Sequence, residues 1–347
     1  MAKETTPSFI VELRLGTSSK DETYLEKGLN AGRMLFNACL GEALSRLDLM
    51  RESKAYRGTL AMSKGAERTQ AFKDLRAKYR FKDSALQSFA LQCKNSAPQI
   101  GQFLDAHTTE KVASRAFAAC DRHALGKIGR PRFKGSGQFH SLASKTNAAG
   151  IRYRDGWLLW RGIEVECSVD LTDEVVAYGL SCRIKYCRIV RRQVRGKAKY
   201  YGQLIVEGAP CQKEKNTAGK EVVGIDIGPS TLAYVGETQA ELKQFCAELK
   251  PLENDIRLLQ RAMDRSRRAS NPGNYKHDGT VRPGAKKWFC SKSYNALRGE
   301  FAEVHRRKAA YRKSLHGNLQ NEVLRVGNNL RVEKNRYNLF QKNFGEG

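Results

Sequence analysis

The chain has 347 residues, with 62 Lys and Arg against 36 Asp and Glu and a formal net charge of +26. The length allows two or three domains that each bury a core, and a positive surplus this large is costly unless a polyanion relieves it. Nucleic acid is therefore the favoured partner, and a membrane surface is disfavoured because the charge is spread along the chain.

Membrane, export and zinc signals are weak. No apolar run reaches the ~18 residues of a membrane span, and residues 1–7 carry no apolar signal core. The nine cysteines are scattered and form no C-x-x-C pair. We therefore expect a cytoplasmic protein with reduced thiols and no zinc site.

The N-terminal part begins with a strand and continues as helices. Residues 9–15 are apolar at the start and alternate between apolar and polar side chains from Val11 onward, which predicts a strand. Residues 22–104 carry apolar side chains at helical spacing, and 113–124 predicts a further helix. Basic residues cluster between Lys64 and Lys82. This cluster is either a solvated helix face or a face toward nucleic acid.

A composition break follows at residues 126–135. Gly, Pro and basic side chains surround one aromatic in Gly-Arg-Pro-Arg-Phe-Lys at 129–134. This pattern suits a loop that lies on a sugar-phosphate backbone, and a plain linker is the alternative. The candidate contacts of this loop are Arg130, Arg132, Phe133 and Lys134.

The next part reads as a small antiparallel β-unit. Strand patterns cover 151–154, 157–160, 163–169, 183–191 and 200–206, and X-Gly turns separate several of them. We expect a barrel-like unit with Arg191 and Arg192 on one rim as nucleic-acid contacts. A polar linker follows at 207–220.

The last part opens with three strand patterns, at 222–227, 231–235 and 242–247, and becomes helical from residue 252. Such a meander followed by a helix is how RNase H-like folds begin. Residues 257–316 contain sixteen Lys and Arg against four Asp and Glu, which suits the wall of a nucleic-acid channel. The candidate contacts are Arg265, Arg267, Arg268, Lys286, Lys287, Arg306, Arg307, Lys308, Arg312 and Lys313.

Two carboxylates follow apolar strands. Asp226 ends the strand at 222–227, and Glu333 ends a short strand at 330–333. A carboxylate in such a place needs a cation, and neighbouring parallel strands would bring both acids onto Mg²⁺. Asp226 could instead cap the turn at Gly228, and Glu333 could pair with Lys334.

The same stretch also fits the D-x-G-x-[ST] phosphate loop of actin-like ATPases and sugar kinases, which share this fold. In those proteins the loop lies near the N-terminus and a second phosphate loop follows. Here basic helices follow, with no second phosphate loop, so an actin-like ATPase is the weaker interpretation.

The order of these features resembles TnpB, the transposon-encoded RNA-guided DNA endonuclease related to type V CRISPR effectors. The resemblance rests on the loop at 129–134, on Gly-Ile-Asp-Ile-Gly at 224–228, and on segments at 264–268, 271–272, 313–317 and 333–345. It covers nearly the whole chain.

The resemblance implies an α+β multidomain protein. Its parts are a wedge-domain strand at 1–16, a helical recognition insert at 17–125, a wedge β-unit at 126–215 and a RuvC-like nuclease domain at 216–347. It implies a prokaryotic, nucleoid-associated protein that binds a guide RNA from the transposon end and double-stranded target DNA. Asp226 and Glu333 match the first two catalytic, Mg²⁺-binding carboxylates.

The chain departs from the family after Glu333. The family continues into a zinc ribbon and a third catalytic aspartate, whereas no aspartate follows Asp278 here. We therefore expect an incomplete nuclease domain in a truncated chain. A nuclease-inactive protein that binds DNA under RNA guidance is the alternative.

Overall fold

The computed structural model describes residues 6–333. Residues 334–347, which carry part of the resemblance, lie outside the described residues. The chain forms two compact units, the first made of Met1–Arg192 and Ala198–Cys211, the second of Gln193–Lys197 and Gln212–Gly347. The main boundary at Cys211 falls within the polar linker predicted at 207–220.

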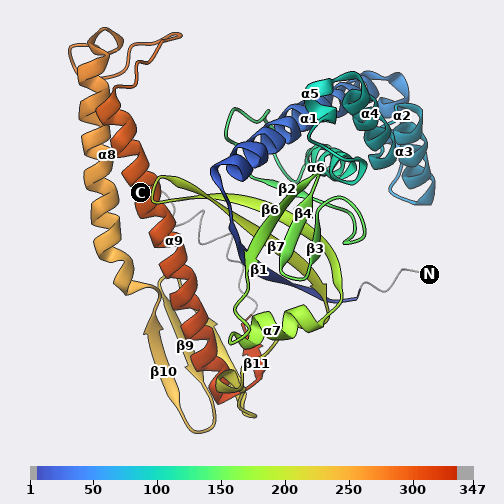
Figure 1. Cartoon of the computed structure of the whole chain (residues 1–347). Helices are drawn as coiled ribbons and strands as arrows, with labels where there is room; N and C mark the ends of the chain where they lie inside the picture. The colour runs from blue at the N-terminus through green and yellow to red at the C-terminus, as the bar shows by residue number, and fades with distance from the viewer. Residues whose placement is uncertain (1–5, 334–347) are drawn as a thin grey trace. The chain divides into compact units, whose positions relative to one another are not determined.

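The first unit joins helices to a curved antiparallel sheet (Figure 1). Its helices are α1 (Ser19–Glu52), α2 (Lys54–Ala61), α3 (Ala66–Lys78), α4 (Asp83–Ser96), α5 (Pro98–Gly101), α6 (Ala106–Ala124) and α7 (Glu174–Ser181). Its strands are β1 (Ser8–Gly16), β2 (Ser141–Ala143), β3 (Arg152–Arg154), β4 (Trp157–Trp160), β5 (Ile163–Ser168), β6 (Ile184–Val194) and β7 (Lys197–Glu207).

The seven-stranded sheet has the order β2-β6-β7-β1-β5-β4-β3. The N-terminal strand β1 pairs with β7, from Ser8 opposite Glu207 to Arg14 opposite Tyr201, and with β5 on its other edge. All the predicted strands of this region are confirmed. Two elements are not among the predicted ones: β2, which is only three residues long, and α7, whose N-cap is Asp173.

The long helix α1 begins at a capping box. The Ser18 side chain accepts from the backbone N of Asp21, and the Asp21 carboxylate accepts from the backbone N of Ser18. Gly28 lies directly against the indole of Trp160, a ring that is buried. A side chain at Gly28 would therefore collide with the sheet.

Asp105 connects the helices to the sheet. One of its carboxylate oxygens caps α6 by accepting from the backbone N of Thr108 (2.9 Å), and the other accepts from the indole Nε1 of Trp160 (3.1 Å). Helices α1, α4 and α6 share one continuous hydrophobic core with the sheet. The expected boundary at residue 125 therefore does not separate two cores.

The second unit is a four-stranded sheet and a long helical hairpin. Its elements are β8 (Val222–Ile227), β9 (Thr231–Val235), β10 (Ala240–Gln244), α8 (Lys250–Ser270), α9 (Lys292–Val326) and β11 (Asn329–Val332). The strand order is β10-β9-β8-β11. The third strand lies two to three residues earlier in the structure than predicted, because a 3-10 turn at Ala247–Leu249 ends the meander before α8.

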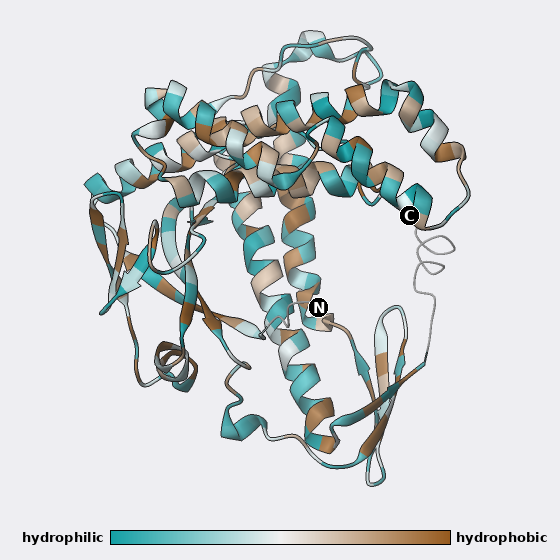
Figure 2. Ribbon diagram, turned by 90° about the vertical axis from the view of Figure 1, so that its right-hand side faces the viewer, coloured by the Kyte–Doolittle hydropathy of each residue, from teal (hydrophilic) through white to brown (hydrophobic). Residues whose placement is uncertain are grey.

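One face of the four-stranded sheet packs against the C-terminal part of α9. Val223, Leu232 and Tyr234 form a small core with Val323 and Val326. Hydrophilic residues dominate much of the hairpin outside this core (Figure 2). Among the described residues, no helix is both long enough and apolar enough to cross a membrane.

Candidate active site and nucleic-acid interface

The two predicted catalytic carboxylates lie at the ends of adjacent parallel strands. Strand β11 pairs with β8 in parallel, with Asn329 opposite Val222 and Val332 opposite Ile225. One residue further along both strands come Glu333 and Asp226, on strands ~4.8 Å apart. The predicted parallel pairing of the first and fourth strands is confirmed, although these two residues are far apart in the sequence.

Asp226 lies on the open face of the sheet, so our expectation that it is poorly solvated is wrong. Along β8, Val223 is buried while Val222, Gly224 and Asp226 are exposed. The exposure alternates along β8 because α9 covers only one face of the sheet. Glu333 is exposed as well. Water therefore reaches both carboxylates, and burial does not force a cation onto them.

The alternative roles for these acids are only partly tested. In the turn after β8 the backbone bond runs from Gly228 N to Thr231 O (2.9 Å). Within residues 6–333, none of the hydrogen bonds found in this turn uses the Asp226 carboxylate. A pairing of Glu333 with Lys334 lies outside the described residues.

Two carboxylates can supply oxygen ligands to Mg²⁺, which keeps several waters when proteins bind it. The described part of the chain contains no group of three or more His, Cys, Asp and Glu side chains that could hold a metal ion. Asp226 and Glu333 are the residues that would supply carboxylate oxygens to a Mg²⁺ ion at this edge of the sheet.

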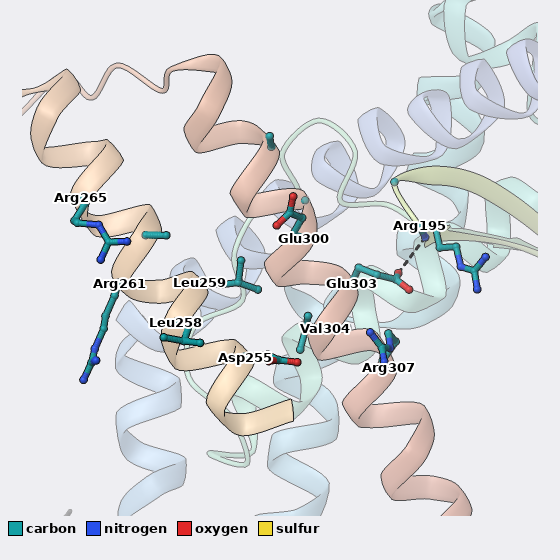
Figure 3. Close-up of a pocket in the computed structure, with 14 residues that line it drawn as sticks. Arg195, Asp255, Leu258, Leu259, Arg261, Arg265, Glu300, Glu303, Val304 and Arg307 are labelled. Atoms are coloured by element: carbon teal, nitrogen blue, oxygen red, sulfur yellow. Dashed lines mark hydrogen bonds between the residues drawn. The ribbon is translucent and has the colours of Figure 1, made fainter. Parts of the chain in front are cut away.

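The hairpin of α8 and α9 carries a groove of about 920 Å³ (Figure 3). Leu258 and Leu259 of α8 and Val304 of α9 contribute apolar surface to it. Charges of both signs border the groove, including Glu300 and Arg265. A groove of mixed charge does not by itself select phosphate, although Arg265 and Arg307, two of the predicted nucleic-acid contacts, line it.

Several predicted contacts on α8 and α9 already have carboxylate partners. Arg267 and Arg268 both pair with Asp264 (3.2 and 2.6 Å). Lys308 pairs with Glu253 at 2.7 Å. These pairs hold the guanidinium and ammonium groups in place and lower the net charge that they present.

The remaining predicted contacts of the second unit divide into two engaged side chains and a group of exposed ones. Arg306 pairs with Glu303 at 2.6 Å, and Lys286 is half-buried and bonds to the carbonyl of Gly284 at 2.8 Å. The exposed basic side chains predicted as contacts are Arg265, Lys287, Arg307, Arg312 and Lys313.

Pairing with arginine lowers the pKa of several carboxyl groups. The pKa of Asp264 is lowered mainly by its hydrogen bond from Arg268, and the pKa of Asp48 by its hydrogen bond from Arg130. The hydrogen bond from Arg306 lowers the pKa of Glu303 to about 2. All three acids are therefore ionised at neutral pH.

The loop at 129–134 lies along α1. Arg130 forms a two-pronged bond with Asp48 (3.2 and 2.8 Å). Asn37 bonds both backbone groups of Lys134, accepting from its N at 2.8 Å and donating to its O at 2.9 Å. Arg130, Arg132, Phe133 and Lys134 are all exposed, so the four predicted contacts face solvent, and Arg130 does so while paired with Asp48.

Arg191 requires a correction, because it is not on an open rim. It is 8% exposed, its guanidinium pairs with Glu26, and it donates to the carbonyl of Gly137 at 2.6 Å. Tyr200 donates to the other oxygen of Glu26 at 2.6 Å. Burial and this carboxylate raise the pKa of Tyr200. Arg191 therefore ties the sheet to α1.

Arg192 is also engaged. Both of its terminal nitrogens donate to Glu12 on β1 (2.5 and 2.6 Å), and its guanidinium lies 4.8 Å from the ring centre of Tyr201. The sequence analysis missed Glu12 and Glu26 as partners, because alternation marks which face a side chain takes but not which strand lies beside it.

No model of a known protein family matches the chain, and no curated protein matches it. Among solved structures, it is similar to a chain in the cryo-EM structure of a Cas12f1–sgRNA–target DNA complex, with 12% identity over 94% of this chain and 81% of that one, and a TM-score of 0.40. A chain of a CRISPR-Cas12f ternary complex gives 12% identity, 94% and 80% coverage, and a TM-score of 0.29. At these scores the likeness does not establish function, so the assignment below rests on the chain's own residues.

Proposed function

We propose that the protein is a TnpB-like, RNA-guided DNA-binding protein whose second unit is a RuvC-type nuclease domain. The observation that carries the nuclease assignment is the parallel pairing of β8 with β11, which sets Asp226 beside Glu333. A guide RNA from the transposon end and double-stranded target DNA would be its partners, in keeping with the net charge of +26.

Asp226 and Glu333 would hold Mg²⁺ in this proposal. The bound ion would supply Lewis-acid stabilisation of charge on a phosphodiester. The chain's own residues would contribute the oxygen ligands and, through the exposed cations of α8 and α9, the attraction that keeps a strand near the sheet. Water has free access to the exposed carboxylates, so a hydrolytic nucleophile is at hand.

A nuclease-inactive, RNA-guided DNA-binding protein is the second candidate. It is favoured by the lack, within residues 6–333, of a group of three acidic or other metal-ligating side chains. Two exposed carboxylates bind a divalent ion more weakly than three, because each charged ligand adds to the attraction. Such a protein would act by occupying its target.

The test is to co-express the chain with the RNA of its transposon end and to purify the complex. The complex is then incubated with Mg²⁺ and plasmids that carry the guide-matched target beside a randomised flank. Cleavage that is lost in Asp226→Asn and Glu333→Gln, with RNA retention unchanged, supports the nuclease. Glu237→Gln is the control, because Glu237 is an exposed acid in a turn of the same sheet.

The remaining outcomes separate the two candidates. RNA retention and target binding without cleavage would establish the inactive binding protein. A chain that retains no RNA and binds target DNA no better than unrelated DNA would refute both.

A further inference from the structure

The loop between α8 and α9 is organised by one buried amide. Asn271 is 8% exposed. Its Nδ2 donates to the carbonyls of Arg267 (2.8 Å) and Phe289 (2.9 Å), and its Oδ1 accepts from the backbone N of Phe289 (2.7 Å). Asn271 thus hydrogen-bonds both the backbone N and the backbone O of Phe289, which is the pattern that a neighbouring β-strand would provide.

The side chain of Phe289 points to solvent from this fixed backbone and is 67% exposed. The preceding Trp288 is already engaged: the guanidinium of Arg267 lies 5.0 Å from the centre of its ring, and Tyr275 makes an edge contact at 5.8 Å. A single exposed aromatic is ordinary. A fixed backbone beneath the exposed ring is the less ordinary feature, because it removes much of the ordering cost of binding.

The loop that carries Phe289 is strongly basic in its sequence. Between residues 271 and 292 the sequence has five Lys and Arg and one acid, Asp278. The Asp278 carboxylate accepts from the backbone N and the hydroxyl of Thr280 (2.8 and 2.6 Å), so it is occupied within its own turn. The basic residues are Lys276, Arg282, Lys286, Lys287 and Lys292.

An exposed ring among cations matches the chemistry of a single nucleic-acid strand. Cations attract the phosphates, and the ring stacks on a base whatever its sequence. A duplex offers phosphates but keeps its bases stacked inside, so the ring would gain little from it. An acidic protein would satisfy the cations and leave the ring without a flat partner.

We propose that Phe289 is a stacking platform for an unpaired base of single-stranded nucleic acid, with the loop lysines on the adjacent phosphates. This deepens the proposed function and rests on it, because a displaced DNA strand or an unpaired guide segment is the single strand in question. Asn271 is a positioning residue that sets the ring in place before the strand arrives.

The experiment compares two labelled single strands of equal length, about ten nucleotides. One is oligothymidylate, and the other has abasic sites in place of the bases. They carry the same phosphates, so their difference in affinity for the full chain reports contacts with the bases, and substitution of Phe289 isolates the share of this ring. Fluorescence anisotropy gives both dissociation constants.

We expect Phe289→Ala to weaken the binding of oligothymidylate by about 5- to 100-fold and to leave the abasic strand unchanged. Phe289→Trp should restore the preference. Val281→Ala is the matched control, because Val281 is an apolar side chain of the same loop that is 47% exposed. Asn271→Ala should lose the preference with the phenyl ring still present.

The outcomes distinguish this inference from the proposed function. A wild-type chain that binds neither strand argues against nucleic-acid binding altogether. Equal binding of both strands by the wild type, or an equal loss for both strands in Phe289→Ala, overturns the stacking role while the proposed function stands. Helix content from circular dichroism shows whether Asn271→Ala also unfolds the hairpin. If it does, the comparison of Phe289→Ala with Phe289→Trp decides whether the ring stacks on a base.

Discussion

At the scale of single residues, two asparagines do the same work in different units. Asn37 holds the backbone of Lys134, and Asn271 holds that of Phe289, each by accepting from the N and donating to the O of its partner. In both places the partner's side chain is left pointing to solvent. A side-chain amide that replaces a strand can therefore present a basic or aromatic residue from a loop.

Thiol reactivity is a prediction at this scale. Burial raises the pKa of Cys39, Cys167 and Cys187 to about 12, whereas Cys290 is exposed. Because the thiolate is the reactive form, we expect iodoacetamide at pH 7.5 to label Cys290 before these three. Peptide mass spectrometry over a time course measures the order, and early labelling of Cys39 would show that the core of the first unit opens easily.

A second residue-scale prediction concerns pH. His140 is exposed overall, but partial loss of water around its ring, together with the guanidinium of Arg191, lowers its pKa from the usual value of 6.5. The unfolded chain then binds this proton at a higher pH than the folded chain, so the free energy of unfolding falls as the pH drops below 6.5. We expect His140→Gln to reduce the loss of melting temperature between pH 7.5 and 5.5, and an identical loss would contradict the role of this imidazole.

At the scale of elements, the contact of α1 with the sheet depends on a missing side chain. A Cβ on Gly28 would clash with ring carbons of the Trp160 indole, whereas a Cβ on Gly58 of α2 would meet nothing within 4 Å. We expect Gly28→Ala to destabilise the first unit by about 1–3 kcal/mol, as overpacking does. Urea unfolding measures this.

Gly58→Ala is the control for that substitution. Alanine removes backbone freedom from the unfolded chain, so we expect a gain of roughly 0.4–1 kcal/mol at this open helix position. Equal effects at the two glycines would show that helix propensity, and not the contact with Trp160, dominates at Gly28.

The α8–α9 hairpin leads to a prediction on salt dependence. Arg307, Arg312 and Lys313 are exposed on α9, whereas Lys308 is paired with Glu253. Each phosphate contact removed by substitution with Gln should reduce the slope of log K against log salt by about 0.7 for a single strand or 0.9 for a duplex. Lys308→Gln should change the slope less, and equal changes would mean that its pairing with Glu253 does not persist in the complex.

Periodicity predicted most of the elements because burial enforces it. The apolar stripe of α1 and the alternation of β1 appear directly as buried residues. The carboxylate pair was predicted from the strand order of RNase H-like sheets, in which the first and fourth strands are parallel neighbours, and β8 and β11 do pair in this way. Periodicity could not predict the partners of Arg191 and Arg192, because those depend on which strand and helix pack beside β6.

At the scale of the whole molecule, the two units differ greatly in the size of their cores. The first unit has one continuous core across helices and sheet, while the cluster under the sheet of the second unit holds five buried residues among those that the structure describes, including Val223 and Tyr234. We expect the second unit to unfold first in urea, because less apolar surface leaves water when it folds.

Tryptophan fluorescence can separate the two transitions. Trp157 and Trp160 lie in the first unit and Trp288 in the second. We expect Trp288→Phe to remove the signal of the transition at lower urea and to keep the other. One cooperative transition seen by all three residues would contradict independent unfolding.

The pairing of β11 with β8 has a consequence for the order of events during synthesis. The ribosome releases the chain from its N-terminus at ~5–20 residues per second. The first unit and Asp226 therefore emerge several seconds before Glu333, because the helices α8 and α9 are synthesised in between. The carboxylate pair cannot form until β11 adds to the edge of β8. A nascent chain would present its basic surfaces before its acidic pair exists, so the proposed function implies that RNA binds before a metal ion does.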